Sequence, residues 1–232
     1  MPTFLITGAS QGIGAEIARQ FSHEPDARVV LVSRNEGSLS KVAAQCAADA
    51  TVTVEVCDVT DEEAVARLAD SVSARFGVPD VVVNNAGLFR PGGILDTSVA
   101  DFRAQVDVNL NSAFIVTKAF LAEMVSRGSG MFFLMASVAA FRAYPAGVAY
   151  GASKHGLLGL ARALREETRE RGIRVTTVMP GATWTPSWHG AGHPEERMMP
   201  VADIAALVLS AWRLSDRSVV EEIIVRPQLG DI

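Results

Sequence analysis

The stretch TGASQGIG, residues 7–14, separates a short apolar run at residues 3–7 from a helical pattern that begins at Gly12. Glycines let a chain turn sharply and let its backbone approach a phosphate closely. The helix that follows offers free N–H groups and the positive end of its dipole to a pyrophosphate. A strand, a glycine-rich turn and a helix in this order indicate a dinucleotide-binding unit. A glycine-rich turn without a ligand is the alternative.

Outward from this stretch, the chain alternates apolar runs with helical patterns. Runs such as residues 81–83 are apolar throughout, which is typical of strands that helices cover on both faces. Alternating strands and helices pair in parallel through right-handed crossovers. The sequence therefore predicts one α/β domain over residues 1–232, a Rossmann-like doubly wound parallel sheet in three layers (α/β/α), with its ligand crevice at the carboxyl ends of the strands. We expect strands at residues 3–7, 28–33, 51–56, 81–84, 130–137, 175–179 and 222–225, and helices at 12–21, 37–48, 61–76, 101–125, 150–170 and 201–214.

Composition narrows the class of protein. With 26 acidic and 21 basic side chains the net charge is −5, which disfavours a nucleic-acid partner. We find no apolar stretch of the ~18 residues that span a bilayer, and residues 1–6 are too short for a signal sequence, so we expect no membrane partner. Cys46 and Cys57 form no disulfide framework, which indicates a cytoplasmic protein. His189 and His193 lack companions at ligand spacing, so we expect no metal.

The end of the second predicted strand bears on the choice of cofactor. An NAD site of this kind carries an acidic residue there, which accepts a hydrogen bond from the ribose 2′-OH. This chain carries Ser33 and Arg34 instead. A guanidinium pairs with a 2′-phosphate through charge-assisted bonds, and Ser33 could donate another. We therefore expect NADP(H) rather than NAD(H), with a solvated surface arginine as the alternative.

Two further strand ends fit the same cofactor. Asp58 and Val59 follow the third predicted strand, where an adenine would lie, and a carboxylate can accept from its exocyclic amine. A turn that only leads into the next helix is the alternative there. Asn84–Gly87 ends the fourth strand, where side-chain amides can brace the strand ends. The small Ala86 and Gly87 leave room for a ribose.

Three residues downstream carry plausible chemistry. Ser137 ends the fifth predicted strand, and Tyr150 and Lys154 lie four residues apart on the next helix, so they share one face. An ordinary phenol has a pKa of ~10, and a nearby ammonium lowers it. Tyr150 could then exchange a proton with a carbonyl or alcohol oxygen near neutral pH, while Ser137 holds that oxygen. An exposed helix pair is the alternative for the tyrosine and the lysine.

These motifs, taken together, resemble the short-chain dehydrogenase/reductase family, of the NADP type, with likeness to ketoacyl-reductase-like and sepiapterin-reductase-like members. The resemblance runs from Thr3 to about Ala211 and rests on Thr7-Gly8-x-x-x-Gly12-x-Gly14, Asn84-Asn85-Ala86-Gly87, Asn109, Ser137, Tyr150-x-x-x-Lys154 and Pro180-Gly181. It implies that Tyr150 is the general acid/base and that Ser137 positions the substrate oxygen. It also implies that Lys154 binds the nicotinamide ribose and lowers the tyrosine pKa, and that Asn109 supports a water that links the lysine to solvent.

The residues and the resemblance together give an expected cofactor site. The nicotinamide carboxamide would lie at the Pro180-Gly181 stretch with Thr183 or Thr185, and the backbone of Ala182 would line the cofactor as well. The expected set is Gly8, Ser10, Gln11, Gly12, Ile13, Gly14, Ser33, Arg34, Asp58, Val59, Asn85, Ala86, Gly87, Tyr150, Lys154, Pro180, Gly181, Thr183 and Thr185.

The substrate side is predicted from an irregular stretch, residues 181–200, which we interpret as a lid. Its two tryptophans favour an apolar or aromatic substrate; packing of the lid onto the core is the alternative. Residues 181–188 resemble the lid of bacterial sepiapterin-reductase-like members, which implies a pterin or another planar carbonyl. Candidate pocket residues are Ser137, Phe141, Arg142, Tyr144, Trp184, Trp188 and His189. The arginine could meet an acidic substrate group, although a surface position is the alternative.

The expected activity is hydride transfer between NADP(H) and the carbonyl or secondary alcohol of a small molecule. A cofactor-binding sensor or regulator without turnover is the alternative from another class. An epimerase or dehydratase is disfavoured, because those relatives carry a longer C-terminal substrate region. Residues 225–232 lack the Gly-Gly ending frequent in tetrameric members of the family, so we expect a homodimer as readily as a homotetramer.

Overall fold

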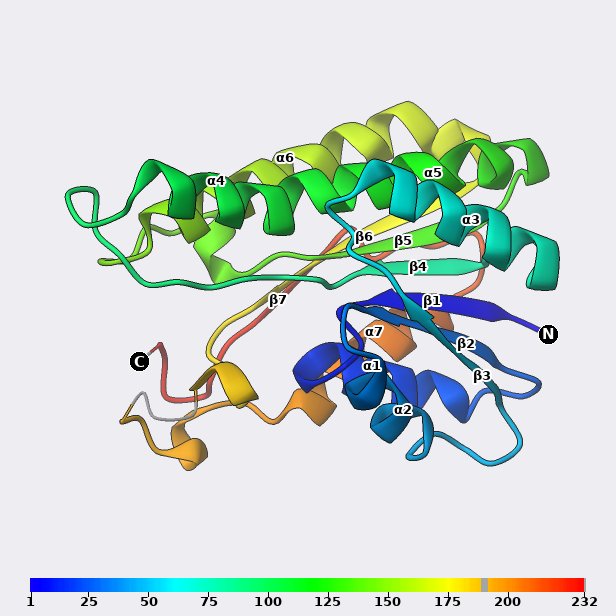
Figure 1. Ribbon diagram of the computed structural model, residues 1–232, viewed down its shortest axis with the longest axis horizontal. Helices are drawn as coiled ribbons and strands as arrows, with labels where there is room; N and C mark the ends of the chain where they lie inside the picture. The colour runs from blue at the N-terminus through cyan, green and yellow to red at the C-terminus, as the bar shows by residue number, and fades with distance from the viewer. Residues whose placement is uncertain (189–191, 232) are drawn as a thin grey trace.

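The computed structural model describes residues 1–188 and 192–231 and confirms the three-layer α/β/α architecture. Seven parallel strands form one sheet in the order β3-β2-β1-β4-β5-β6-β7 (Figure 1). Because β1 and β4 are neighbours, the strand order reverses direction between them, which is where a doubly wound sheet places its crevice. The strands are β1 Thr3–Thr7, β2 Arg28–Ser33, β3 Thr51–Val56, β4 Val81–Asn84, β5 Gly130–Met135, β6 Ile173–Pro180 and β7 Glu222–Val225.

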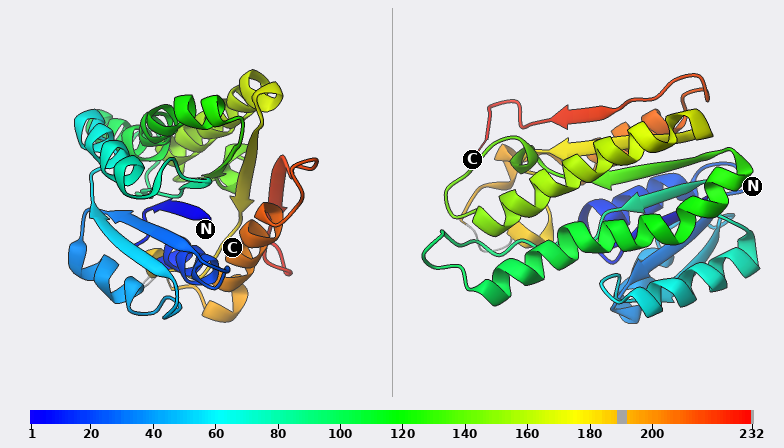
Figure 2. Two further views of the ribbon diagram at one scale, coloured as in Figure 1. Left: turned by 90° about the vertical axis from the view of Figure 1, so that its right-hand side faces the viewer. Right: turned by 90° about the horizontal axis from the view of Figure 1, so that it is seen from above.

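Helices cover both faces of this sheet. Figure 1 shows α3, α4, α5 and α6 on one side and α1, α2 and α7 on the other; Figure 2 shows the same layers in two further views. The helices of the first side are α3 Glu62–Phe76, α4 Val99–Val106, α5 Ser112–Arg127 and α6 Val148–Thr168, and those of the second are α1 Gly12–Ser22, α2 Glu36–Ala43 and α7 Val201–Trp212.

The apolar strands separate two hydrophobic cores. Leu5 of β1 lies in the core under α3, α5 and α6, whereas its neighbours Phe4 and Ile6 lie in the core over α1 and α7. All three side chains are fully buried. Successive side chains of a strand point to opposite faces, so a strand between two helical layers must be apolar at every position. This is why β1 and its neighbours show no alternation with polar residues.

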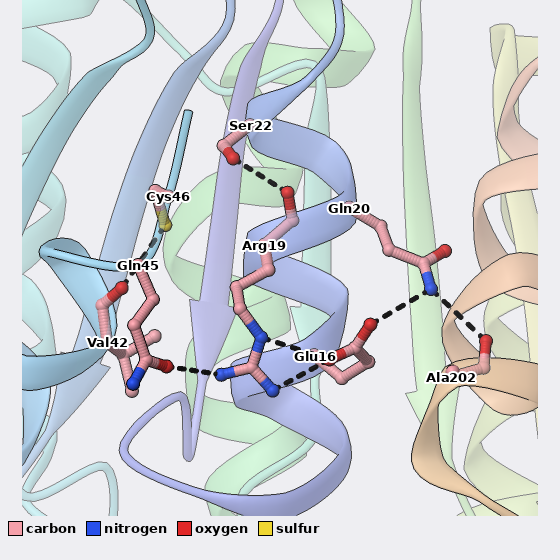
Figure 3. A network of polar contacts seen from close by, with 8 residues as sticks. All are labelled: Glu16, Arg19, Gln20, Ser22, Val42, Gln45, Cys46 and Ala202. Carbon is pink, nitrogen blue, oxygen red and sulfur yellow. Dashed lines mark hydrogen bonds and ion pairs between the residues drawn. The ribbon is translucent and has the colours of Figure 1, made fainter. Parts of the chain in front are cut away.

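Polar contacts fix α1 against its neighbours on the second face (Figure 3). Arg19 donates from Nε and Nη2 to Glu16 Oε2, at 3.0 and 2.7 Å, and from Nη1 to Gln45 Oε1 at 2.8 Å. Gln20 Nε2 donates to Glu16 Oε1 at 3.1 Å and to the Ala202 carbonyl at 3.2 Å. These contacts join α1 to the segment after α2 and to α7. The glycine-rich turn at the start of α1 is therefore carried by a helix held on both sides.

One long helix on the first face contains an irregular turn. Residues Val99–Arg127 form α4, a π-helical turn at Asp107–Asn111, and α5. The α4 part packs on α6, and the α5 part packs on α3. Within the described residues, this is the one stretch long and apolar enough by length and composition to cross a membrane. A helix in a globular core meets the same criterion, and Phe120 and Met124 of α5 are buried against the sheet.

Candidate active site

A cavity of about 940 Å³ lies at the carboxyl ends of the strands. It runs from residues that follow β2 and β3 to residues that follow β5 and β6. The structure brings most of the predicted site into its lining: Gly8, Ser10, Gln11, Gly12, Ile13, Ser33, Arg34, Asp58, Val59, Asn85, Ala86, Gly87, Ser137, Arg142, Tyr144, Tyr150, Lys154, Pro180, Gly181, Ala182, Thr183, Thr185 and Trp188. Four predicted residues do not line it: Gly14, Asn109, Phe141 and Trp184.

The glycine-rich turn has the shape that a dinucleotide requires. Gly8 and Gly12 adopt left-handed φ angles of +64° and +59°, which only glycine takes without strain. Gly14 lies behind the turn, where an added Cβ would lie 2.6 Å from the Gly8 carbonyl oxygen. Asn85 Nδ2 donates to the carbonyls of Thr7 and Gly8, at 3.0 and 3.2 Å. A held turn with an open face before a helix N-terminus fits a pyrophosphate.

Thr7 is a structural residue of this turn whose part the sequence did not reveal. Its buried Oγ1 donates to the Val83 carbonyl at 3.2 Å and accepts from the backbone N–H groups of Asn85 and Ala86, at 3.0 and 3.1 Å. The last residue of β1 thus fixes the end of β4. The side-chain amide of Asn85 braces the strand ends as predicted. A threonine that ends a strand next to a glycine turn could have signalled this bond.

Arg34 lies at the edge of the cavity, and its side chain is 77% exposed. Its Nη1 lies 4.0 Å from Asp58 Oδ2, at the limit of an ion pair. Asp58 Oδ1 accepts from the N–H and hydroxyl of Thr60, at 3.0 and 2.7 Å. The Thr60 N–H, more than Arg34, lowers the pKa of this carboxyl. Asp58 therefore builds the turn that leads to α3 and also lines the cavity.

Ser137, Tyr150 and Lys154 meet at the inner end of the cavity. Ser137 precedes the 3₁₀ turn Val138–Ala140, and its Oγ accepts from the Ala139 N–H at 3.1 Å. Ser137 and Tyr150 both line the cavity there, and the Ser137 hydroxyl lowers the pKa of the Tyr150 phenol. Lys154 Nζ donates to the Met135 carbonyl at 2.7 Å and lies 5.5 Å from the centre of the Tyr150 ring. The carbonyl of Met135 is a partner that no sequence pattern indicated.

The titration of this cluster differs from the sequence expectation. Burial raises the pKa of Tyr150, and the Ser137 hydroxyl only partly offsets this. Burial is the largest influence on the Tyr150 pKa in this structure and shifts it upward, and the expected lowering by Lys154 stays a prediction. Burial also lowers the pKa of Lys154 to about 8. Burial disfavours the charged form of each group, so both shift toward their neutral forms.

Asn109 lies behind the cavity in the π-helical turn, with 1% of its surface exposed. Its Oδ1 accepts from the Leu88 N–H at 2.7 Å, and its Nδ2 donates to the Leu88 carbonyl at 2.9 Å and to Ser153 Oγ at 3.0 Å. Ser153 in turn donates to the Tyr150 carbonyl at 2.8 Å. The Asn109 side chain therefore ties the loop after β4 to the helix that carries Tyr150. No sequence pattern indicated that Ser153 would take part in these contacts.

Two aromatic ring pairs lie in the cavity lining. Phe89 meets Tyr150 edge-on, with ring centres 5.1 Å apart, and Trp188 meets His193 edge-on at 5.7 Å. All four residues line the cavity. The segment after β6 also reaches the glycine turn, since an added Cβ on Gly12 would lie 3.3 Å from Thr185. Thr185, Trp188 and His193 of the predicted lid segment line the cavity, and the role of that segment as a lid stays a prediction.

Two predicted pocket residues are corrected. Phe141 ends the 3₁₀ turn and is 42% exposed, outside the cavity lining. Trp184 donates from its backbone N–H to the Met199 carbonyl at 2.8 Å, beside the bridge between Thr183 and Met199, and belongs to the base of the segment rather than to the lining. His189 lies outside the described residues.

Asp231 lines the cavity although no sequence pattern indicated it. Its carboxylate accepts from the hydroxyl of Tyr144 at 2.8 Å and from Arg226, at 3.0 Å from Nε and 2.6 Å from Nη2. Arg142 Nη1 lies 3.5 Å from the same carboxylate. Arg226, then Tyr144, lower the pKa of Asp231. The segment after β7 thus forms a wall of the cavity.

Cys46 and Cys57 are free thiols. Among residues 1–188 and 192–231, no three or more His, Cys, Asp or Glu side chains gather in a way that could hold a metal ion.

Known proteins share this sequence and geometry. A sepiapterin reductase from Chlorobaculum tepidum is 39% identical, over 98% of this chain and 97% of that protein. An alcohol dehydrogenase from the archaeon Thermococcus sibiricus, complexed with 5-hydroxy-NADP, has a TM-score of 0.90 and 30% identity, over 98% of this chain and 97% of the other. A metagenomic short-chain oxidoreductase in complex with NADP has a TM-score of 0.82 and 34% identity, with the same coverage. The model of the short chain dehydrogenase family matches residues 2–196, and this chain therefore belongs to that family of oxidoreductases.

Proposed function

We propose that this protein is an NADPH-dependent oxidoreductase that reduces the carbonyl group of a small planar or apolar molecule to a secondary alcohol, or catalyses the reverse reaction. The observation that carries the proposal is that Ser137, Tyr150 and the buried Lys154 meet in one cavity lining, with Lys154 Nζ 5.5 Å from the centre of the Tyr150 ring. Bound NADPH would supply the hydride, and the protein would orient the reactants.

Tyr150 would donate a proton to the substrate oxygen, and Ser137 would hold that oxygen in place. Because burial raises the pKa of Tyr150, its phenol is protonated near neutral pH. A protonated phenol is a proton donor, which is what the oxygen of a reduced carbonyl needs. The Ser137 hydroxyl, which lines the same cavity, would hold the same oxygen. Lys154 places an ammonium near the tyrosine ring, where it would stabilise the phenolate that proton transfer leaves behind.

The cofactor would lie along the strand ends. The glycine turn and the N-terminus of α1 would hold its pyrophosphate, and Asn85, Ala86 and Gly87 line the middle of the cavity. Ser33 and Arg34, at the end of β2, would hold a 2′-phosphate. The guanidinium has one distant partner, 4.0 Å away, and its side chain is largely exposed, so it is available to an anion. The NADP present in two similar solved structures supports this choice.

The substrate end favours a planar carbonyl compound. Phe89 and Trp188 both line the cavity, and the Phe89 ring meets that of Tyr150. Flat aromatic surfaces stack favourably on such rings. One relative that matches 98% of this chain is a sepiapterin reductase. A pterin with a carbonyl side chain is therefore the first substrate to test.

The test is NADPH oxidation, followed by absorbance, with ketones, diketones, quinones and pterins. We expect turnover with at least one carbonyl compound. Tyr150→Phe should lose about 10²–10⁴-fold in kcat, because it cannot donate the proton. Its affinity for NADPH, measured by fluorescence titration, should stay within about twofold. Equal turnover by the wild type and the variant would disprove the assigned role of Tyr150. Tight NADPH binding without turnover of any carbonyl would favour the alternative function, a cofactor-binding sensor.

A further inference from the structure

We propose that the segment Arg226–Asp231 latches the loop Phe141–Gly147 in place, and that Asp231 is the positioning residue that sets substrate selectivity. The inference rests on the proposed carbonyl reduction, because it concerns the shape of the substrate end of the same cavity. Arg142, Tyr144 and Asp231 line that end together with Ser137 and Tyr150.

The loop has a special place in the chain. It connects the 3₁₀ turn that follows Ser137 to α6, which carries Tyr150 in its first turns. Any shift of the loop therefore moves the wall that faces the substrate and acts on both elements that hold the reactive hydroxyls. Positions of this kind need support from neighbouring groups, because sub-ångström errors at a reaction centre cost rate and selectivity.

On one side, the loop is held by backbone hydrogen bonds. The Gly92 N–H donates to the Ala146 carbonyl at 2.8 Å, and Gly92 and Gly147 form an isolated parallel bridge. Ala146 adopts a left-handed φ of +55°, which strains the backbone of a residue with a Cβ. Such a conformation persists only where the surroundings hold it.

On the other side, Asp231 supplies the support. Its carboxylate accepts a hydrogen bond from the Tyr144 hydroxyl and lies next to Arg142. Two side chains of the loop therefore contact the same carboxylate. The contact joins positions 87 residues apart in the chain. Figure 2, right-hand view, shows the end of the chain close to the segment between β5 and α6.

The segment after β7 is itself anchored. The Gly181 N–H donates to the Val225 carbonyl at 2.8 Å, and the Gly230 N–H donates to the Pro227 carbonyl at 2.9 Å. Gly230 has a φ of +86°, which turns the chain back toward the cavity. Arg226 then binds Asp231 through both Nε and Nη2. Arg226, from the same segment, therefore holds the Asp231 carboxylate in place, and that carboxylate contacts the loop through Tyr144.

The charges explain why Asp231 would act by positioning. Two guanidinium groups, Arg142 and Arg226, face its carboxylate, and the Tyr144 hydroxyl occupies Oδ2 as well. Its acceptor capacity is largely used within the protein. Removing the charge should therefore release Arg142 and loosen Tyr144, which reshapes the cavity, while Ser137, Tyr150 and Lys154 keep their own contacts.

The first experiment compares Asp231→Asn with Asp216→Asn, the same change at a fully exposed carboxylate. Steady-state kinetics with NADPH would use diacetyl and its phenyl-substituted analogue. We expect the ratio of kcat/KM for the two diketones to change by about tenfold in Asp231→Asn, through KM, because one charged hydrogen-bond network is lost. Asp216→Asn should leave the ratio unchanged, and Asp231→Glu should restore part of it. NADPH affinity should not change in any of the variants.

The second experiment does not depend on turnover. In hydrogen exchange, the amides of residues 141–147 should exchange about tenfold faster in Asp231→Asn than in the wild type, with β1 and β4 unaffected. Tyr144→Phe should give a smaller change in the same direction. Two results would overturn the latch. One is that the loop amides of Asp231→Asn exchange at wild-type rates. The other is an equal loss of kcat with both diketones at unchanged KM. An inactive wild type with loop exchange that still depends on Asp231 would instead reject the proposed function and keep the latch.

Discussion

At the scale of single residues, Lys154 is a buried cation whose proton is linked to folding. Burial lowers its pKa to about 8, from an ordinary 10.5. Between these two pH values the unfolded chain binds more protons at this group than the folded chain. The free energy of unfolding therefore rises with pH in that window, by at most about 1.4 kcal/mol per pH unit from this group. Below pH 8 the penalty for burying the charge is fully present.

We expect this linkage to appear in the difference in free energy of unfolding between the wild type and Lys154→Met. Urea denaturation at several pH values would measure it, since titrations common to both proteins cancel in the difference. The difference should shift in favour of the wild type as pH rises above 8. The same change at the exposed Lys41 serves as the control. A flat difference for Lys154→Met across the window would contradict the lowered pKa.

Residue-scale chemistry was predictable where spacing alone sets it. Tyr150 and Lys154 share a helix face because they are four residues apart. Ser137 was predicted to end the fifth strand, but β5 ends at Met135 and Ser137 precedes the 3₁₀ turn that follows. The direction of the tyrosine pKa shift was not predictable, because it depends on how completely the phenol is buried. Asp231 was missed for a related reason. Its partner Tyr144 is 87 residues away, and no local pattern records such a contact.

At the scale of secondary-structure elements, two glycines that end helical segments should differ in their tolerance of a side chain. Gly128 ends α5 and Gly172 ends the 3₁₀ turn after α6, with φ of +73° and +75°. An added Cβ on Gly172 would overlap the Gly128 carbonyl oxygen, whereas one on Gly128 would meet no atom within 4 Å among the described residues. Because both positions carry the same backbone strain, the pair isolates the cost of the clash.

Gly128→Ala should lower the free energy of unfolding by about 1 kcal/mol, the cost of a left-handed backbone. Gly172→Ala should lower it by about 3 kcal/mol or more, because a backbone oxygen cannot move aside easily. Urea denaturation monitored by circular dichroism would measure both. Equal losses in the two variants would show that the segments after α5 and α6 separate at little cost.

Most elements were predictable from the apolar pattern, and their exact ends less so. The strands Thr3–Thr7, Arg28–Ser33 and Val81–Asn84 begin and end as predicted, because strands buried on both faces are apolar throughout. The helix predicted for residues 37–48 ends early, at Ala43. The chain beyond it is drawn to α1, where Ser22 Oγ accepts from the Ala47 N–H at 2.8 Å. Tertiary contacts therefore override helix propensity in this segment.

At the scale of the whole molecule, the cavity spans both halves of the sheet, so a bound cofactor should stabilise the entire fold. A ligand at about 100 times its Kd adds about 2.7 kcal/mol to the free energy of unfolding. For a protein of this size that corresponds to a rise in Tm of about 5–10 °C. We expect NADPH to raise Tm more than NADH at equal concentration.

A thermal shift assay would test this expectation with Arg34→Ala and Tyr150→Phe. The advantage of NADPH should disappear in Arg34→Ala, which loses the guanidinium for the 2′-phosphate. It should persist in Tyr150→Phe, which changes proton transfer and not the phosphate end of the cavity. A larger rise with NADH in the wild type would refute the proposed preference for NADPH.

The architecture followed from the sequence because alternating strands and helices leave few possible topologies. The position of the cavity followed too, since parallel strands bring their carboxyl ends to one edge. The end of the cavity formed by Arg142, Tyr144 and Asp231 did not. It is built by the loop before α6, the segment after β6 and the segment after β7, which meet only in the folded chain.

The π-helical turn at Asp107–Asn111 changes the direction in which the side chains of the long helix point after it. In an α-helix each residue rotates the side-chain direction by about 100°. A π turn closes its hydrogen bonds one residue later, so every side chain after it is rotated relative to the pattern before it. The α4 part can thus contact α6 while the apolar side of α5 faces α3 and the sheet. One continuous helical stretch can therefore pack against two neighbours that lie in different directions. Asn109 lies in the turn where the direction of the side chains changes.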